Sequence, residues 1–190
     1  MISRSMQAAA LVATLLAVPA ARAVEVAGVK VDDQVKVGAN ELVLNGAGVR
    51  TKVFVKVYVG ALYVSQKANT PAALLEATSP RRMTMRMLRD VDADTLYGAL
   101  RDGLKDNNSE AELTALKAST EQFAEIMKKV GSAKVGDTVA VDFTADGVSV
   151  SFNGEPRGKV AGAAFAKALL KVWLGDNPVD NSLKKALLGG

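Results

Sequence analysis

The chain has 190 residues, with 24 Lys and Arg against 20 Asp and Glu, and so carries a formal net charge of +4 at pH 7. This balance is too mild for a nucleic-acid-binding protein, which normally presents a dense basic face. Neither Cys nor His occurs in the sequence. Their absence excludes disulfides, Ser-His-Asp and Cys-His catalysis, and the commonest transition-metal ligand. We therefore predict no metal site, no cofactor and no nucleic-acid partner.

Residues 1–23 have the pattern of a secretory signal peptide. Arg4 gives a positive N-terminal region, residues 8–18 are apolar, and Ala21-Arg22-Ala23 fits the small-x-small cleavage rule. The apolar run is too short for a comfortable membrane span, although a retained amphipathic anchor is an alternative. We expect an exported, periplasmic protein with one mature domain of residues 24–190 and no stable membrane span.

The mature chain opens with short strand patterns. Residues 24–37 alternate loosely around an Asp32-Asp33 turn, and residues 42–44 form a brief apolar strand. The glycine-rich segment Asn45-Gly-Ala-Gly48 then predicts a turn, with Arg50 following it at the start of a β-rich run.

The run at residues 53–64 predicts one long strand. Valine occupies every second position from 53 to 59, and the positions between them are Phe54, Lys56 and Tyr58. Because side chains of a strand alternate between its faces, the valines lie on one side and the Phe, Lys and Tyr side chains on the other. We expect the valine face in the core and the second face toward solvent or a groove.

The middle of the chain predicts a helix, a strand and two more helices. Thr70 and Pro71 start a helix over residues 71–77. Residues 82–88 alternate Met with Arg or Thr, which indicates a strand with a Met face in the core and Arg86 on the opposite face. Asp94 caps a helix over residues 95–105, and a Ser109/Glu112 capping box begins another that ends at Gly131.

The last part of the chain predicts a hairpin and two helices. Residues 138–144 and 147–152 pair across an Asp146-Gly147 turn, residues 161–174 form an alanine-rich helix, and Asp180 caps a final short helix. Because the elements do not repeat as βαβ units, we predict an α+β fold with a mainly antiparallel sheet.

One motif is Leu44-Asn-Gly-Ala-Gly-Val-Arg50, which leads through Lys56-Val-Tyr58 to Gly60-Ala-Leu-Tyr-Val64. A second is Trp173-Leu-Gly-Asp-Asn-Pro-Val-Asp-Asn-Ser-Leu183-Lys-Lys. Together the two motifs resemble the chalcone isomerase family, in its bacterial chalcone isomerase-like branch. This resemblance covers the whole mature chain. It implies an open-faced β-sandwich, in which a large antiparallel sheet carries a layer of helices, with a hydrophobic cleft between them.

The resemblance also implies roles for individual residues. Arg50 matches the Arg that orients the phenolate in the plant enzymes, but Tyr58 stands at the position of their catalytic Thr. Ala93 and Leu100 stand near the positions of the enzymes' Tyr and Asn, and Val172 near that of a Thr or Ser that sets substrate preference. Most catalytic positions are therefore unmatched, and we predict no catalytic residue.

The non-enzymatic branch of the family binds fatty acids through an Arg and a Tyr, and Arg50 with Tyr58 would be that pair here. On one straight strand these residues would be roughly 26 Å apart, so the chain must turn or bulge between them to bring them together. Arg86 and Tyr97 are the further candidates for ligand binding.

We therefore predict an exported, non-catalytic binding protein for a fatty-acid-like or other amphipathic carboxylate, held in a cleft beside Arg50. One alternative is an intramolecular lyase or isomerase, which would need a Tyr or Lys of depressed pKa beside Arg50. The other is an envelope structural or interaction module without a small ligand. Haem ranks low because there is no His to serve as axial ligand. The sequence leaves the oligomeric state open.

Overall fold

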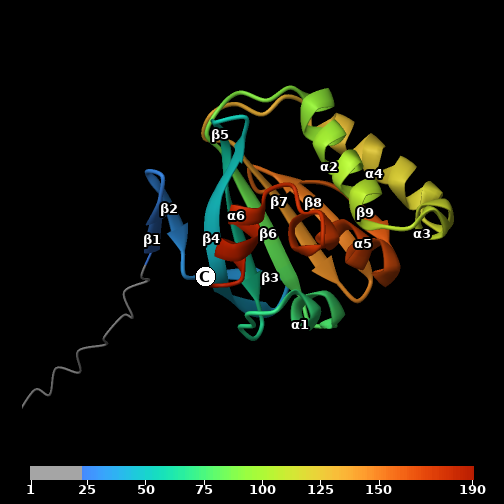
Figure 1. Cartoon of the computed structure of the whole chain (residues 1–190), viewed down its shortest axis with the longest axis horizontal. Coiled ribbons are helices and arrows are strands. Elements are labelled where there is room, and N and C mark those ends of the chain that lie inside the picture. The colour runs from blue at the N-terminus through green and yellow to red at the C-terminus, as the bar shows by residue number, and fades with distance from the viewer. Residues whose placement is uncertain (1–22) are drawn as a thin grey trace, which may run out of the picture.

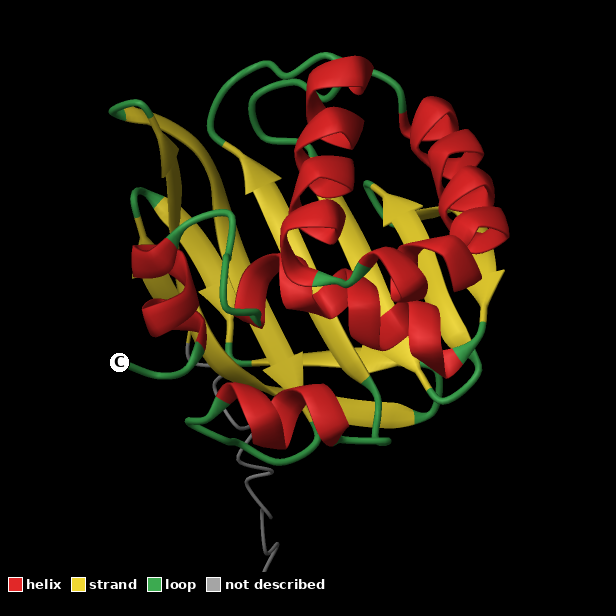
Figure 2. Ribbon diagram, turned by 45° about the vertical axis from the view of Figure 1, so that its right-hand side comes forward, coloured by secondary structure: helices red, strands yellow, loops and turns green. Residues whose placement is uncertain are grey.

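The computed structural model describes residues 23–190, in which one antiparallel sheet carries helices on one face (Figures 1 and 2). Its strands follow chain order, each pairing with the next: β3 (Gln34–Val37), β4 (Asn40–Lys52), β5 (Val55–Val64), β6 (Arg81–Met87), β7 (Thr138–Thr144), β8 (Gly147–Phe152) and β9 (Glu155–Ala161). A separate hairpin of β1 (Ala23–Val26) and β2 (Val29–Asp32) precedes them. The predicted α+β class with an antiparallel sheet is confirmed.

The helices form a layer over this sheet. They are α1 (Pro71–Glu76), α2 (Ala93–Asn107), α3 (Glu110–Ala115), α4 (Lys117–Val130), α5 (Ala163–Leu174) and α6 (Asn181–Leu187). Helix α5 packs on β7 and β8, α4 on β9, and α6 on β4 and β5, while α2 packs on α4 and α5. Across residues 23–190, no helix has both the length and the apolar character needed to cross a membrane.

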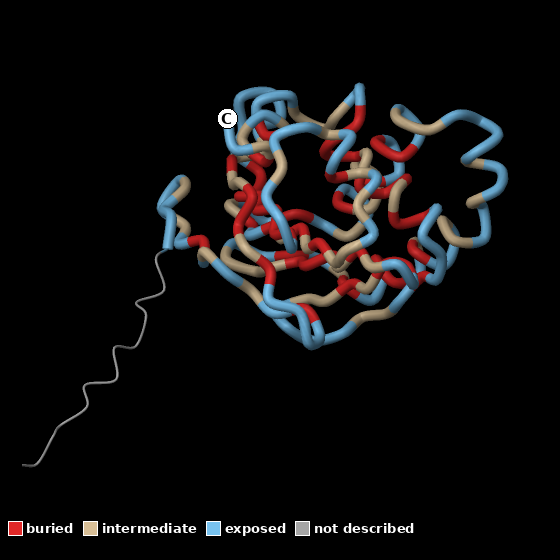
Figure 3. The backbone as a smooth tube through the Cα atoms, turned by 90° about the horizontal axis from the view of Figure 1, so that it is seen from below, coloured by how far each residue is buried: buried red, intermediate tan, exposed pale blue. Residues whose placement is uncertain are grey.

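The main core lies between the sheet and the helices. Met83, Met85 and Met87 are buried there, which confirms the predicted Met face of this strand. A smaller apolar cluster lies on the other face of the sheet and includes Val59 and Tyr63 of β5. The β1–β2 hairpin covers only part of that second face, and its own residues are mostly exposed (Figure 3).

Several local predictions are confirmed. The Thr70 side chain accepts from the N–H of Ala73 at the start of α1, and Ser109 and Glu112 form the capping box of α3. The β7–β8 hairpin has the predicted bounds, and Asp180 caps α6. These signals depend on neighbouring residues only, which is why the sequence suffices to find them.

Three predictions about secondary-structure elements are wrong. Asp92, not Asp94, caps α2. The helix predicted up to Gly131 is divided at Leu116 into α3 and α4, and strand β9 was missed because its sequence, with Pro156 and Gly158, lacks a strand pattern. The predicted signal peptide lies outside the described residues, except for Ala23.

The predicted turn at 45–48 is also wrong, because β4 runs through it. Asn45 is an extra residue in β4, a bulge between the pairs Leu44–Tyr63 and Gly46–Leu62. Its buried side-chain amide donates to the carbonyl oxygens of Ala68 and Leu187, at 3.0 and 2.7 Å. The segment therefore continues the sheet and connects it to the C-terminal helix.

The strand predicted over 53–64 begins later, after a tight turn. Val53 and Phe54 both have positive φ, 47° and 65°, and reverse the chain between β4 and β5. From Val57 to Val64 both faces of β5 are buried, so the expectation of a solvent-facing side is wrong for this part of the strand. The expected core face is wrong at its start, because Val53 and Val55 are exposed. The turn instead creates the hairpin that carries the candidate site.

Candidate functional site

Helix α6 lies directly on β4 and β5 because three glycines leave room for it. A Cβ on Gly46 would lie 2.0 Å from the carbonyl oxygen of Ala186, and one on Gly48 would lie 2.6 Å from the Ala186 Cβ. A Cβ on Gly60 would lie 3.2 Å from the Leu183 side chain. The glycine-rich motif of β4 and β5 therefore forms the surface on which the C-terminal motif, with α6, packs.

Asp180 fixes the start of α6 beside Arg50. Its Oδ1 accepts from the N–H groups of Ser182 and Leu183, at 2.8 and 3.0 Å, which caps the helix. Its Oδ2 accepts from the N–H of Thr51 at 2.8 Å. One carboxylate thus joins the helix to the strand at the residue that follows Arg50.

Arg50 and Tyr58 are direct cross-strand partners in the β4–β5 hairpin. The guanidinium carbon of Arg50 lies 5.6 Å from the centroid of the Tyr58 ring, within cation–π range. The turn at Val53 and Phe54 brings together two residues that a single strand would separate.

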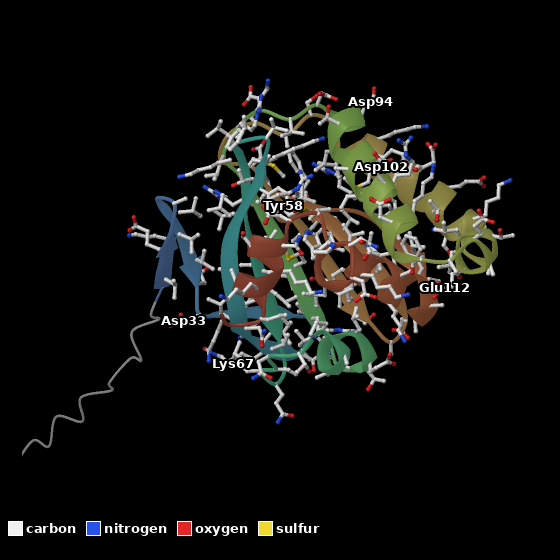
Figure 4. All side chains as sticks on the ribbon, in the orientation of Figure 1. Asp33, Tyr58, Lys67, Asp94, Asp102 and Glu112 are labelled. Atoms are coloured by element: carbon white, nitrogen blue, oxygen red, sulfur yellow. The ribbon has the colours of Figure 1, made fainter. Side chains whose placement is uncertain are left out.

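Tyr58 is buried in the main core between the sheet and the helices, and Figure 4 labels its position. Its hydroxyl oxygen accepts from the indole Nε1–H of Trp173 at 2.9 Å. Burial raises the pKa of Tyr58 to about 12, against the opposing effects of the Arg50 charge and the Trp173 hydrogen bond. The phenol is therefore neutral at physiological pH and keeps its own proton.

Apart from the Tyr58 ring, the guanidinium of Arg50 has no hydrogen-bond or ion-pair partner within residues 23–190. Its Nε is buried without a hydrogen bond, and none of the ion pairs of this region includes Arg50. A buried donor without an acceptor costs free energy. Arg50 is therefore a cationic group that an anionic ligand would satisfy.

A pocket of about 380 Å³ opens beside Arg50, within the usual size range of small-molecule sites. It lies between the β4–β5 hairpin, the loop after β6 and the first turns of α2. Its polar lining residues are Arg50, Lys52, Arg89, Asp90, Asp92 and Thr95, and its apolar ones are Val53, Val55, Val57, Val91, Leu96 and Ala99. Tyr58 does not line the pocket, but its ring contacts the Arg50 guanidinium.

The two carboxylates on the rim of this pocket have partners of their own. Asp90 accepts from Lys134 Nζ and from the N–H of Val135, each at 3.0 Å, and Asp92 accepts from the N–H and hydroxyl of Thr95. These hydrogen bonds lower the pKa of both carboxyl groups. Arg50, Lys52 and Arg89 are the cations left to face a ligand.

Arg86 and Tyr97, the other predicted ligand-binding residues, lie outside the Arg50 pocket. Arg86 is on the opposite face of the sheet, where its Nη1 donates to Thr138 Oγ1 at 3.3 Å. Tyr97 lines a groove of about 260 Å³ that α2 forms with α3 and α4.

Sequence reasoning missed Trp173 and Arg89 as residues around this site. Trp173 belongs to the C-terminal motif, but nothing local indicates that its indole reaches Tyr58. Asp180 was predicted as a helix cap only. Among the residues described, no group of three or more Asp and Glu side chains could hold a metal ion.

The family model described as chalcone isomerase-like matches residues 23–189. The chain therefore belongs to the chalcone isomerase-like family, which confirms the resemblance of its two motifs.

Among solved structures, the chain is similar to a fatty-acid binding protein of Arabidopsis thaliana, with a TM-score of 0.67 and 14% sequence identity. The match covers 85% of this chain and 92% of that one, and it confirms the chalcone isomerase type of fold. No curated protein sequence matches the chain.

Proposed function

We propose that this protein binds an amphipathic carboxylate of the fatty-acid class in the Arg50 pocket and does not transform it. The observation that carries this proposal is the Arg50 guanidinium, which has no hydrogen-bond or ion-pair partner within residues 23–190, at a pocket whose lining includes six Val, Leu and Ala side chains. A guanidinium binds a carboxylate through two parallel N–H···O bonds in addition to charge attraction. The polar and apolar parts of the pocket thus match the two parts of such a ligand.

The apolar lining would supply much of the affinity. Each CH₂ group that moves from water into the pocket contributes about 0.8 kcal/mol. Lys52 and Arg89 add positive charge at the rim, while Asp90 and Asp92 are engaged with their own donors. The similar Arabidopsis protein, described as a fatty-acid binding protein, supports this choice of ligand class.

The isomerase alternative has less support at this site. It would need a Tyr or Lys of depressed pKa beside Arg50, whereas burial raises the pKa of Tyr58 to about 12. A neutral phenol that holds its proton is suited to positioning Arg50 rather than to accepting a proton from a substrate.

Calorimetric titration of the delipidated mature domain with oleate tests the proposal. Arg50→Met keeps the length and apolar stem of the side chain, and we expect it to weaken oleate binding by about tenfold or more, because charge-assisted hydrogen bonds are lost. Arg86→Met is the matched control, since it removes an Arg from the same sheet on the opposite face.

Titration with oleyl alcohol, which has the chain of oleate but no carboxylate, separates the contribution of the head group to the affinity from that of the chain. Wild-type protein should prefer oleate to the alcohol, and Arg50→Met should bind both with similar affinity. Equal oleate affinity in Arg50→Met and Arg86→Met would refute the role of Arg50.

We further propose that the protein is exported to the periplasm, on the basis of the signal pattern in residues 1–23. N-terminal sequencing of the protein from a periplasmic extract should begin at Val24. A protein that keeps Met1 and remains in the cytoplasmic fraction would contradict export.

A further inference from the structure

The tip of the β4–β5 hairpin exposes three consecutive apolar side chains. Val53 is 80% exposed, Phe54 98% and Val55 41%. Val135, at 65%, lies in the loop before β7, whose backbone donates to Asp90 of the neighbouring loop. These loops reach the same end of the molecule as the hairpin tip (Figure 1). Apolar side chains gathered at one exposed end indicate a contact surface.

The turn itself is unfavourable for folding. Two-residue hairpin turns in which both residues have positive φ favour Asn-Gly, because a β-branched or aromatic residue is strained there. This chain instead has Val53 and Phe54 at φ values of 47° and 65°. The residue types of this turn thus disagree with its backbone conformation, and backbone strain of this kind is concentrated at functional sites.

Basic side chains surround this tip. Lys52 and Lys56 flank it on the two strands, and Arg89 lies in the loop after β6. None of the three takes part in an ion pair among the residues that the structure describes. The apolar tip, with basic side chains next to it, complements a membrane surface, where acyl chains lie below anionic head groups.

We propose that the β4–β5 tip docks onto an anionic lipid bilayer. Phe54 and Val53 enter the boundary between head groups and acyl chains, and Lys52, Lys56 and Arg89 contact the phosphates. Because Val53 and Val55 also line the Arg50 pocket, docking would turn the mouth of the pocket toward the bilayer. The docking is independent of the proposed ligand; only the transfer of a lipid from the bilayer to the pocket rests on the proposed function.

Sedimentation with phosphatidylcholine vesicles that contain about one third phosphatidylglycerol tests the docking. Phe54→Gly suits the positive φ of its position, so it should fold at least as well as wild type, and we expect vesicle partition to fall by about tenfold or more. The double variant Lys52→Gln/Lys56→Gln should also weaken partition by about tenfold, with the loss disappearing at high salt.

Matched control variants remove similar groups far from the tip. Val24→Asn changes an exposed valine of the β1–β2 hairpin, and Lys105→Gln/Lys117→Gln removes two exposed lysines of the helix layer. Both controls should partition like the wild type. Phe54→Trp adds a direct reporter, whose emission should shift to the blue on vesicles, while the buried Trp173 stays unchanged.

Several outcomes would overturn the proposal. They are wild-type protein that does not sediment with these vesicles, Phe54→Gly that binds them as tightly as wild type, and self-association through the tip without vesicle binding. Because these vesicles carry no free fatty acid, failure here is distinct from failure of oleate titration in solution.

Discussion

Two arginines on opposite faces of the sheet, Arg82 and Arg50, are held in different ways. On the face away from the helices, Arg82 of β6 binds Asp142 of β7 through two hydrogen bonds of 2.5 and 2.8 Å. On the helix side, Arg50 has a buried Nε without a partner and a contact with the Tyr58 ring.

This difference separates a structural arginine from one that can bind a ligand. Removing one member of a satisfied, partly buried pair leaves the other charge without its partner and costs stability. Removing the Arg50 guanidinium breaks no hydrogen bond or ion pair within residues 23–190 and takes away one buried donor without an acceptor, at the cost of its contact with the Tyr58 ring. Each prediction below probes one side of this comparison, beginning with the largest effect.

The helix side depends on the close approach of α6. Gly46→Ala places a Cβ against the carbonyl of Ala186, so we expect a loss of about 3 kcal/mol or more in the free energy of unfolding, measured by urea denaturation. Gly98→Ala is the control: its Cβ meets nothing within 4 Å, and it should stabilise α2 by about 0.5–1 kcal/mol. A tolerated Gly46→Ala would mean that α6 is not seated as described.

The same substitution should lower the free energy of unfolding at one arginine and not at the other. We expect Arg82→Met to lower the free energy of unfolding by about 2 kcal/mol, because Asp142 is left half-buried without its partner. Arg50→Met should leave stability unchanged or raise it by up to about 1 kcal/mol. Equal losses in both variants, measured by urea denaturation, would remove the distinction between them.

Tyr58 links stability to alkaline pH. Because its pKa is about 12 in the folded protein and 10.0 when exposed, its stabilising contribution is complete below pH 10 and is lost as the pH rises through 12. Tyr58→Phe should lower stability at pH 7 by about 1–2 kcal/mol, since the Trp173 indole loses its acceptor.

Urea denaturation of wild type and Tyr58→Phe between pH 9 and 12 measures the free energy of unfolding across the pKa of Tyr58 in the unfolded chain, 10.0, and in the folded protein, about 12. The stability of Tyr58→Phe should fall less steeply over this range than that of wild type. Parallel curves would show that Tyr58 does not carry the shifted pKa.

Arg86 should have the smallest effect. Its side chain is exposed and makes one long hydrogen bond to Thr138, so Arg86→Met should change the free energy of unfolding by less than about 0.5 kcal/mol. Oleate affinity should stay at the wild-type value. A weakened affinity would place the ligand on the open face of the sheet.

Most of the fold could be predicted from the sequence, but much of the candidate site could not. Caps and turns such as Thr70, Ser109 and Asp146-Gly147 depend on neighbouring residues, and the Met83–Met87 alternation follows from the geometry of a strand. The family motifs added the sheet-and-helix arrangement and drew attention to Arg50. By contrast, Val53 and Phe54 lack every sequence signal of a turn, because their conformation is imposed by the strands that pair on either side.

The sequence by itself determined an α+β chain without Cys or His, a family with an Arg after a glycine-rich segment, and the N-terminal caps of α1, α3 and α6. Only the tertiary structure shows that Gly46 and Gly48 belong to a strand on which α6 packs, rather than to a turn. It also places Arg50 opposite Tyr58, whose hydroxyl group accepts a hydrogen bond from Trp173. Arg86 and Tyr97 lie outside the Arg50 pocket. Contacts between residues distant in the chain depend on how whole elements pack, and no local pattern records that packing.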